Sequence, residues 1–210
     1  MIYKYPRTYH LPWSPGLQHD DKRIESLDAF EGQEVVVTEK MDGENTTMYS
    51  DYIHARSPNP LANHPSRTRI RQIHDRIRRD IPEGFRICGE NMQATHSIHY
   101  QSLPGYFLVF NIWNGDTCLS WDDTVTWSEL LCLPTVKVLY RGPWDSESIQ
   151  RLSSAGEGET EGYVVRVARA YLFNEFTKVN AKYVRANHIQ TDSHWLYQPM
   201  RENEVNGSLF

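Results

Sequence analysis

Hydrophobic residues along the chain gather in short runs, and this pattern favours strands over helices. Val35–Val37 is a compact β-branched run that predicts a buried strand over Gln33–Thr38. Apolar residues that alternate or cluster between turn formers predict further strands. These are Asn45–Ser50, Tyr52–Arg56, Phe85–Glu90, Tyr106–Trp113, Thr117–Trp121, Thr135–Tyr140, Gly162–Val167 and Ala181–Arg185. Asn114 and Gly115 predict a hairpin turn within this set.

Helical spacing is confined to fewer segments. Ile70, Ile73 and Ile77 recur at helical intervals within Ser66–Asp80. Arginines fill the other faces of this predicted helix: Arg67, Arg69, Arg71, Arg76, Arg78 and Arg79. Short helices are also expected near Asp21–Phe30, over Thr124–Leu131, and over Asp145–Leu152 with Asp145 or Ser146 as N-cap. The whole pattern predicts an α+β domain with mixed, largely antiparallel sheets flanked by helices.

Composition places this pattern in an ordinary globular chain. The 210 residues suit a single domain over 1–210, and the 39% of hydrophobic residues can build a core. The formal net charge of −5 argues against a grip on nucleic acid by bulk charge, because such proteins are usually basic. Any contact with nucleic acid is therefore expected to come from a local basic patch.

The cysteines and the N-terminus indicate a cytoplasmic protein. Three cysteines form no Cys-x-x-Cys pair, and an odd count does not suit a disulfide framework, so a reducing compartment is expected. The first residues contain no apolar signal segment, and no window is apolar for long enough to span a membrane.

The segment with the clearest chemistry is Glu39–Asn45, which reads Glu-Lys-Met-Asp-Gly-Glu-Asn. Lys40 follows the predicted buried strand, so its amine is expected to project from a strand end into a cleft. A lysine is a nucleophile only when neutral, which requires nearby positive charge, a metal or desolvation to lower its pKa. The alternative is an exposed, inert lysine beside an Asp-Gly turn.

Five later segments follow Lys40 in a suggestive order. They are Arg56-Ser57, Ile87–Met92 with Glu90, the aromatic strand Tyr106–Ile112 with Phe110, and Glu161–Arg166, followed by the basic strand Lys182–Arg185. Each segment has a plain alternative, because an aromatic on a strand is usually core and a loop carboxylate is usually solvated.

In this order the segments resemble the covalent nucleotidyltransferase superfamily, which comprises polynucleotide ligases and mRNA capping enzymes. Lys40–Gly43 matches its motif I, Lys-x-Asp-Gly, and the other segments resemble motifs Ia, III, IV and V in turn. The resemblance covers residues 35–190 and implies an adenylation domain of the ATP-grasp-like ligase type, with a central nucleotide cleft. Two positions depart from the usual pattern. Val184 stands where motif V often has a second lysine, which Arg185 or Lys178 would replace, and Arg166 ends motif IV where many members have lysine.

The resemblance implies a role for each matched residue. Lys40 is the catalytic nucleophile that attacks the α-phosphate of ATP. The implied ATP-binding residues are Glu39, Lys40, Asp42, Asn45, Arg56, Glu90, Phe110, Glu161, Arg166, Lys182 and Arg185. Glu161 and Glu90 are the implied ligands of Mg²⁺ or Mn²⁺, although Glu90 could instead bind the ribose. Phe110 would stack on adenine.

The resemblance further implies an ATP-dependent RNA ligase that joins a 3′-hydroxyl to a 5′-phosphate. Too little chain follows Arg185 for the OB-fold domain that capping enzymes and most DNA ligases carry, so a separate partner could supply substrate binding. A DNA ligase-like nick sealer and a non-catalytic nucleic-acid-binding relative are the alternatives. Arg67, Arg71 and Arg78 could grip phosphates, or they could simply face water. The nine histidines, including His188 and His194, show no zinc-type ligand pairs and are expected at the surface or against substrate.

Overall fold

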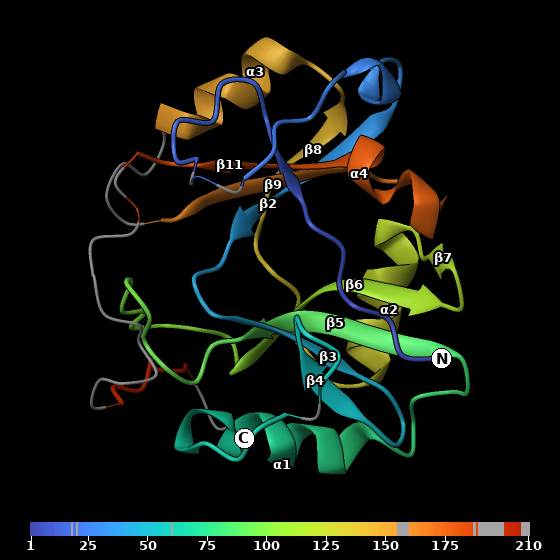
Figure 1. Cartoon of the computed structure of the whole chain (residues 1–210), viewed down its shortest axis with the longest axis vertical. Helices are drawn as coiled ribbons and strands as arrows, with labels where there is room; N and C mark the ends of the chain where they lie inside the picture. The colour runs from blue at the N-terminus through green and yellow to red at the C-terminus, as the bar shows by residue number, and fades with distance from the viewer. Residues whose placement is uncertain are drawn as a thin grey trace.

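Two β-sheets face each other in this computed structural model, which describes residues 1–17, 19, 21–59, 61–154, 160–186, 188 and 200–206 (Figure 1). The first sheet contains, in spatial order, β1 (Tyr9–His10), β11 (Asn180–Val184), β9 (Gly162–Val167), β2 (Glu34–Lys40) and β8 (Val138–Pro143). The second contains β10 (Tyr171–Leu172), β7 (Thr117–Cys118), β6 (Phe107–Asn114), β5 (Phe85–Asn91), β3 (Glu44–Met48) and β4 (Ile53–Ala55). Every named strand pair is antiparallel except β1 with β11. The predicted fold class is therefore confirmed.

Short helices cover the outer faces of the two sheets. They are α1 (Thr68–Ile77), α2 (Trp121–Leu130), α3 (Ser146–Arg151) and α4 (Phe176–Val179), with 3₁₀ turns at Asp28–Phe30, Pro65–Arg67, Leu152–Ser154 and Phe173–Glu175. Figure 1 shows α1 beyond the second sheet and α3 beyond the first. None of the helices in the described part of the chain has the length and apolar character needed to cross a membrane.

The apolar runs form the core as the sequence pattern predicts. Val35, Val36 and Val37 of β2 are completely buried, because neighbouring strands flank β2 and layers cover both its faces. The isoleucine stripe of α1 packs on the second sheet, against Met48 and Ile87 among others. Burial of such a stripe is the main source of stability for a short helix.

Three local predictions are corrected by the structure. The helix expected near Asp21–Phe30 is only the 3₁₀ turn Asp28–Phe30. The strand expected over Thr117–Trp121 stops at Cys118, because the Ser120 hydroxyl accepts a hydrogen bond from the Asp123 amide and starts α2 at Trp121. The strand expected from Thr135 begins at Val138. The expected N-cap at Asp145 is confirmed, since its carboxylate accepts from the amides of Glu147 and Ser148.

Gly162 begins β9 in a backbone conformation that other residues rarely adopt. Its φ is +152°, and a Cβ added there would lie 2.0 Å from the Tyr183 carbonyl oxygen on β11. We expect Gly162→Ala to lower the free energy of unfolding by about 2–4 kcal/mol, because overpacking and backbone strain add. Urea denaturation followed by circular dichroism measures the loss. Gly105→Ala, whose Cβ would meet only the Pro134 ring at 3.0 Å, is the control, and an equal loss there would contradict the expectation.

Candidate active site

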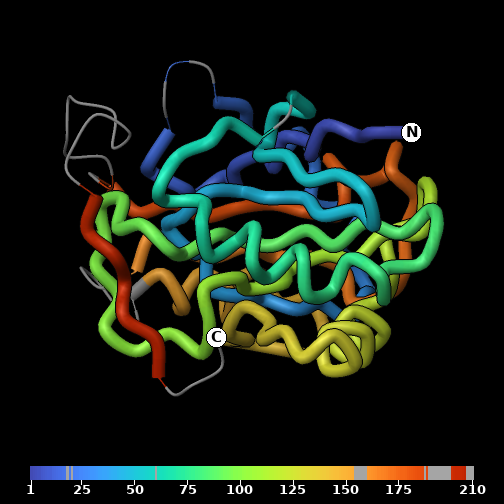
Figure 2. The backbone as a smooth tube through the Cα atoms, turned by 90° about the horizontal axis from the view of Figure 1, so that it is seen from below, coloured from blue at the N-terminus to red at the C-terminus, as the bar shows by residue number. Residues whose placement is uncertain are grey.

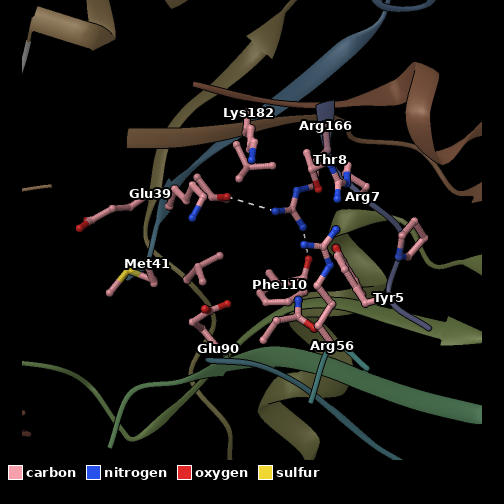
Figure 3. Close-up of a pocket in the computed structure, with 16 residues that line it drawn as sticks. Tyr5, Arg7, Thr8, Glu39, Met41, Arg56, Glu90, Phe110, Arg166 and Lys182 are labelled. Atoms are coloured by element: carbon pink, nitrogen blue, oxygen red, sulfur yellow. Dashed lines mark hydrogen bonds between the residues drawn. The ribbon is translucent and has the colours of Figure 1, made fainter. Parts of the chain in front are cut away.

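A cleft lies between the two sheets and receives side chains from both (Figure 3). The N-terminal segment that runs from the second sheet to β1 lines it as well. The lining residues are Tyr5, Pro6, Arg7, Thr8, Thr38, Glu39, Lys40, Met41, Asn45, Arg56, Glu90, Phe110, Val136, Val164, Arg166 and Lys182. Eight of the residues to which the sequence assigned ATP binding are in this set. Asp42, Glu161 and Arg185 are not.

Lys40 and Glu161 meet because of the strand register. Lys40 is the last residue of β2 and pairs with Gly162 at the start of β9. Glu161 directly precedes that glycine, so its carboxylate lies at the same edge of the sheet. The Lys40 Nζ is 2.5 Å from Glu161 Oε1. The Lys40 side chain is 25% exposed, which leaves the amine accessible from the cleft.

Asp42 is held in place behind Lys40 by the loop after β5. Its Oδ2 accepts hydrogen bonds from the Ser97 amide, the Ser97 hydroxyl and the Ile98 amide at 2.7–2.8 Å. Its own amide donates to the Tyr100 hydroxyl at 3.2 Å. Burial alone would raise the pKa of Asp42, but hydrogen bonds from His188 and Ser97 lower it well below its usual value.

His188 joins Asp42 to Glu161. Its Nε2 lies 3.5 Å from Asp42 Oδ1 and 3.5 Å from Glu161 Oε1, and the side chain is buried. A ring nitrogen between two carboxylates either donates a proton to them or shares a bound cation with them. From the sequence, His188 is expected at the surface or against substrate, but its side chain is instead buried against these two carboxylates.

Carboxylates dominate the electrostatics around the lysine. Burial lowers the pKa of Lys40, whereas the nearby carboxylates of Glu161 and Glu90 raise it, and the net pKa lies above the ordinary value of a lysine. Burial raises the pKa of Glu90 to about 8, against the opposing effect of Lys40. These carboxylates therefore stabilise the ammonium form of Lys40, and a bound cation would offset their negative charge.

Basic side chains gather in the rest of the cleft. Figure 3 shows Arg7, Arg56 and Arg166 on the side that also holds Phe110 and Tyr5. Despite the net charge of −5, the cleft therefore contains the local basic patch that the sequence analysis required. Guanidinium groups at such positions suit a polyphosphate, because they present several N–H donors in a planar fork.

Arg166 also ties the two sheets together. It projects from β9, is 4% exposed, and donates to Thr38 Oγ1 at 3.2 Å and to the Phe110 carbonyl oxygen on β6. Its Nε has no hydrogen-bond partner among the described residues. The arginine that ends motif IV thus lines the cleft and also links the two sheets through hydrogen bonds.

Lys182 enters the cleft from β11. Its Nζ lies 3.3 Å from Asp21 Oδ1, and Asp21 Oδ2 in turn lies 3.0 Å from His10 Nε2. Burial lowers the pKa of Lys182, and the charge of Lys40 lowers it further, while Asp21 acts in the opposite direction. Mutual repulsion between the two lysines favours the neutral form of either one.

Phe110 presents an aromatic surface to the cleft while packing as a core residue. It is 9% exposed and makes an edge contact with Tyr5, with the ring centroids 5.4 Å apart. The Tyr5 hydroxyl donates to Asn111 Oδ1 at 2.6 Å, which fixes the tyrosine in the wall. Figure 3 shows the Glu39 carboxylate pointing away from the arginine side of the cleft.

Several residues singled out from the sequence lie outside the cleft lining. Arg185 donates from Nε to the Thr160 carbonyl at 2.7 Å, and Lys178 lies near Tyr9 and Thr177 on another surface. Neither replaces the missing motif V lysine in the lining, where Arg7 is found instead. Arg7 belongs to no recognisable motif, so only tertiary structure could reveal it.

The arginines proposed to grip nucleic acid are engaged differently from one another. Arg67 is 8% exposed and pairs with the Glu44 carboxylate, and Arg71 donates to the Leu61 carbonyl at 2.5 Å. The Arg78 side chain is half-exposed, and its Nη1 lies 4.0 Å from Asp75 Oδ1. The burial of Arg67 removes it from an exposed phosphate-binding face. A role for Arg71 and Arg78 stays a prediction, and His194 lies outside the described residues.

The donor atoms present fit a divalent cation. One atom each of Asp42, Glu161 and His188 lies within 4.8 Å of the other two, and all three residues are buried. The two predicted ligands were Glu161 and Glu90, and Glu90 lines the adjacent cleft with a carboxyl whose pKa is raised. Carboxylate oxygens suit Mg²⁺ and Mn²⁺, and an imidazole nitrogen is better tolerated by Mn²⁺.

The fold and this cleft define the class of the protein. Two facing, largely antiparallel sheets, with a motif I lysine at a strand end between them, fit the covalent nucleotidyltransferase superfamily of ligases. Residues 33–184 match the RNA ligase family, and the chain belongs to that family. No curated protein matches the chain.

Solved structures share this fold at low sequence identity. An archaeal ATP-dependent RNA ligase (form 2) is 18% identical with a TM-score of 0.61, covering 88% of this chain and 48% of that one. A candidate ATP-dependent DNA ligase from Aquifex aeolicus is 20% identical with a TM-score of 0.58, covering 88% and 50%. An RNA ligase of Naegleria gruberi, in its E312A mutant with AMP and Mn, is 17% identical with a TM-score of 0.53, covering 77% and 52%. The chain therefore spans about half the length of these structures.

Proposed function

We propose that this chain is an ATP-dependent RNA ligase that works through a covalent adenylate on Lys40. The observation that carries the proposal is the Lys40 amine, which contacts Glu161 at 2.5 Å at the end of a strand that opens into a basic, aromatic-walled cleft. A lysine that served only to stabilise the fold would not need the neighbouring arginines. Family membership supports the same reading.

In the first step Lys40 loses a proton and its amine attacks the α-phosphate of ATP. A phosphorus–nitrogen bond forms, the bond to the leaving oxygen breaks, and pyrophosphate departs. Phosphoryl transfer depends mostly on positioning and charge neutralisation. Arg7, Arg56, Arg166 and Phe110 line the cleft. The three arginines would neutralise the phosphates, and the Phe110 ring would pack against the adenine.

Glu161 and Glu90 would hold the divalent ion, Mg²⁺ or Mn²⁺, with Asp42 beside them. The ion would supply positive charge near the phosphates and offset the carboxylates that keep Lys40 protonated. Structures of the Naegleria gruberi RNA ligase have been solved with AMP and Mn and with ATP and Mn, which supports the use of a nucleotide and a divalent ion here.

In the later steps AMP passes from Lys40 to the 5′-phosphate of a nucleic acid, and a 3′-hydroxyl then displaces AMP. The phosphorus–nitrogen bond breaks when the lysine regains a proton. The substrate is RNA, as a nick or break and also within an RNA/DNA duplex. A separate partner that contributes to substrate binding is also part of the proposal. The described cysteines Cys88, Cys118 and Cys132 are free, which suits the proposed cytoplasmic location.

The charge on Lys40 makes the first step depend on pH. Its pKa is raised, so the neutral amine is scarce near pH 7 and increases as pH rises. We expect the rate constant of adenylate formation to rise about tenfold per pH unit while pH stays below the pKa of Lys40. Ionisation of Glu90, with its pKa of about 8, would strengthen binding of the divalent ion over the same range, while its new charge would also hold the proton on Lys40. Rapid-quench labelling at saturating ATP measures the rate, and a profile that falls with pH would contradict the assignment.

Sealing of matched nicks tests the substrate. Four duplexes carry RNA or DNA on the 3′-hydroxyl side and RNA or DNA on the 5′-phosphate side of the nick. We expect sealing to be fastest with RNA at the 3′-hydroxyl side. Equal or faster sealing of the all-DNA nick would instead support the DNA ligase alternative, and self-adenylylation without sealing of any nick would show that a partner is required.

A further inference from the structure

Two parts of the chain beyond residue 184, where the family match ends, converge on Asp42. One is His188. The other is the segment 200–206, which Figure 2 shows in red alongside the green loop between β5 and β6. Isolated bridges join Ala94 to Glu202 and Leu103 to Val205, so the two segments are paired along their backbones.

Asn203 is the centre of this pairing. It is 2% exposed, and its amide nitrogen donates to the carbonyls of Met92 and Ala94 at 2.9 and 3.2 Å. Its Oδ1 accepts from the Thr95 hydroxyl at 3.1 Å and from the Tyr100 amide at 2.9 Å. Both donors and both acceptor positions of the side chain are therefore used, which is the pattern of a fixed structural clamp.

The loop that Asn203 clamps is the one that holds Asp42. Tyr100 is bound to Asn203 through its backbone amide, and its hydroxyl accepts from the Asp42 amide. Ser97 and Ile98 of the same loop bind Asp42 Oδ2, while His188 approaches Oδ1. The Asp42 carboxylate is thus held at both oxygens. His188 also contacts Glu161, and Glu161 contacts Lys40, so the position of Asp42 affects the position of the lysine amine.

We propose that His188 and Asn203 are positioning residues for adenylate formation, and this rests on the proposed function. They lie outside the cleft lining, as does Asp42. They hold the Asp42–Glu161–Lys40 arrangement in the geometry that attack requires. Displacement of a reacting group by a fraction of an ångström reduces its rate more than it reduces the affinity for the nucleotide.

The test is single-turnover formation of the protein adenylate with labelled ATP over a range of ATP concentrations. We expect His188→Ala and Asn203→Ala each to lower the limiting rate constant by about tenfold or more, with half-saturating ATP changed less than about threefold. His188→Gln, which keeps an N–H donor at a similar reach, is expected to recover most of the rate.

A matched control separates positioning from stability. Asn180 is 1% exposed and hydrogen-bonded to the Phe176 carbonyl and the Tyr171 hydroxyl. Within the described part of the chain, its side chain makes no hydrogen bond to the clamped loop. Asn180→Ala should lower the thermal midpoint without a comparable fall in the limiting rate constant.

Three results would overturn the inference. They are wild-type rates in both alanine variants, an equal fall in Asn180→Ala, or a loss that lies in ATP affinity alone. If Asn203→Ala does not fold, the inference is tested by the limiting rate constants of His188→Ala and His188→Gln alone. A wild-type protein that forms no adenylate would instead refute the proposed function, which keeps the two failures distinguishable.

Discussion

Lys40→Ala is expected to abolish labelling of the protein by ATP carrying a labelled α-phosphate, in the presence of Mg²⁺ or Mn²⁺. The loss should be about a thousandfold or more, because no other group can form the phosphorus–nitrogen bond when the nucleophile is removed. Lys182 also lines the cleft, but its Nζ contacts Asp21 and not Glu161. Denaturing gels after a fixed incubation measure the labelled fraction.

Lys137→Ala is the control for that experiment, because Lys137 is exposed at the approach to β8. It should label as the wild type does. Acid cleaves a phosphoramidate bond. Label that persists in Lys40→Ala and survives acid treatment would place the covalent bond elsewhere and remove Lys40 from the mechanism.

Glu161→Ala is expected to reduce adenylate formation by about a hundredfold while the protein remains folded. Two consequences of the substitution oppose each other. Removal of the Glu161 charge lowers the pKa of Lys40, which favours the neutral amine. It also removes the contact that aims the amine and a proposed ligand of the divalent ion, and we expect these losses to dominate.

Glu161→Gln distinguishes the two effects, because it removes the charge and keeps the shape. If Glu161 acted only through the pKa of Lys40, the glutamine variant would form adenylate faster than wild type near pH 7. We expect it to be slower and to need more divalent ion for half-maximal rate. Glu147→Ala, at an 85% exposed side chain on α3, is the control. Normal labelling in both Glu161 variants would remove this residue from the site.

Much of the fold follows from local pattern. Val35–Val37 forms the buried strand that its β-branched run predicts. The hairpin predicted at Asn114-Gly115 joins β6 to β7, with Gly115 and Asp116 in the turn. The Asp21–Phe30 segment was harder to predict, because it has no sustained period and is ordered mainly by long-range contacts such as the His10–Arg23 bridge. Strands as short as β1 and β10, with two residues each, carry no periodic signal.

For the candidate site, too, some features could be predicted from the sequence and others could not. The sequence by itself determined the order Lys40, Arg56, Glu90, Phe110, Glu161 and Lys182, because each belongs to a motif at a strand or a strand end. It also located the lysine next to a turn that the Asp42-Gly43 pair favours. These are short-range properties of neighbouring residues, so they can be recognised without knowledge of the fold.

Only the tertiary structure decided which charges share the cleft. It brought in Arg7 from the N-terminal segment, left Arg185 outside the cleft lining, and paired Arg67 with Glu44. It also set His188 against Asp42 and joined Asn203 to the loop that holds Asp42. These contacts connect residues far apart in sequence, and their existence depends on sheet register and on packing between layers, which no local pattern encodes.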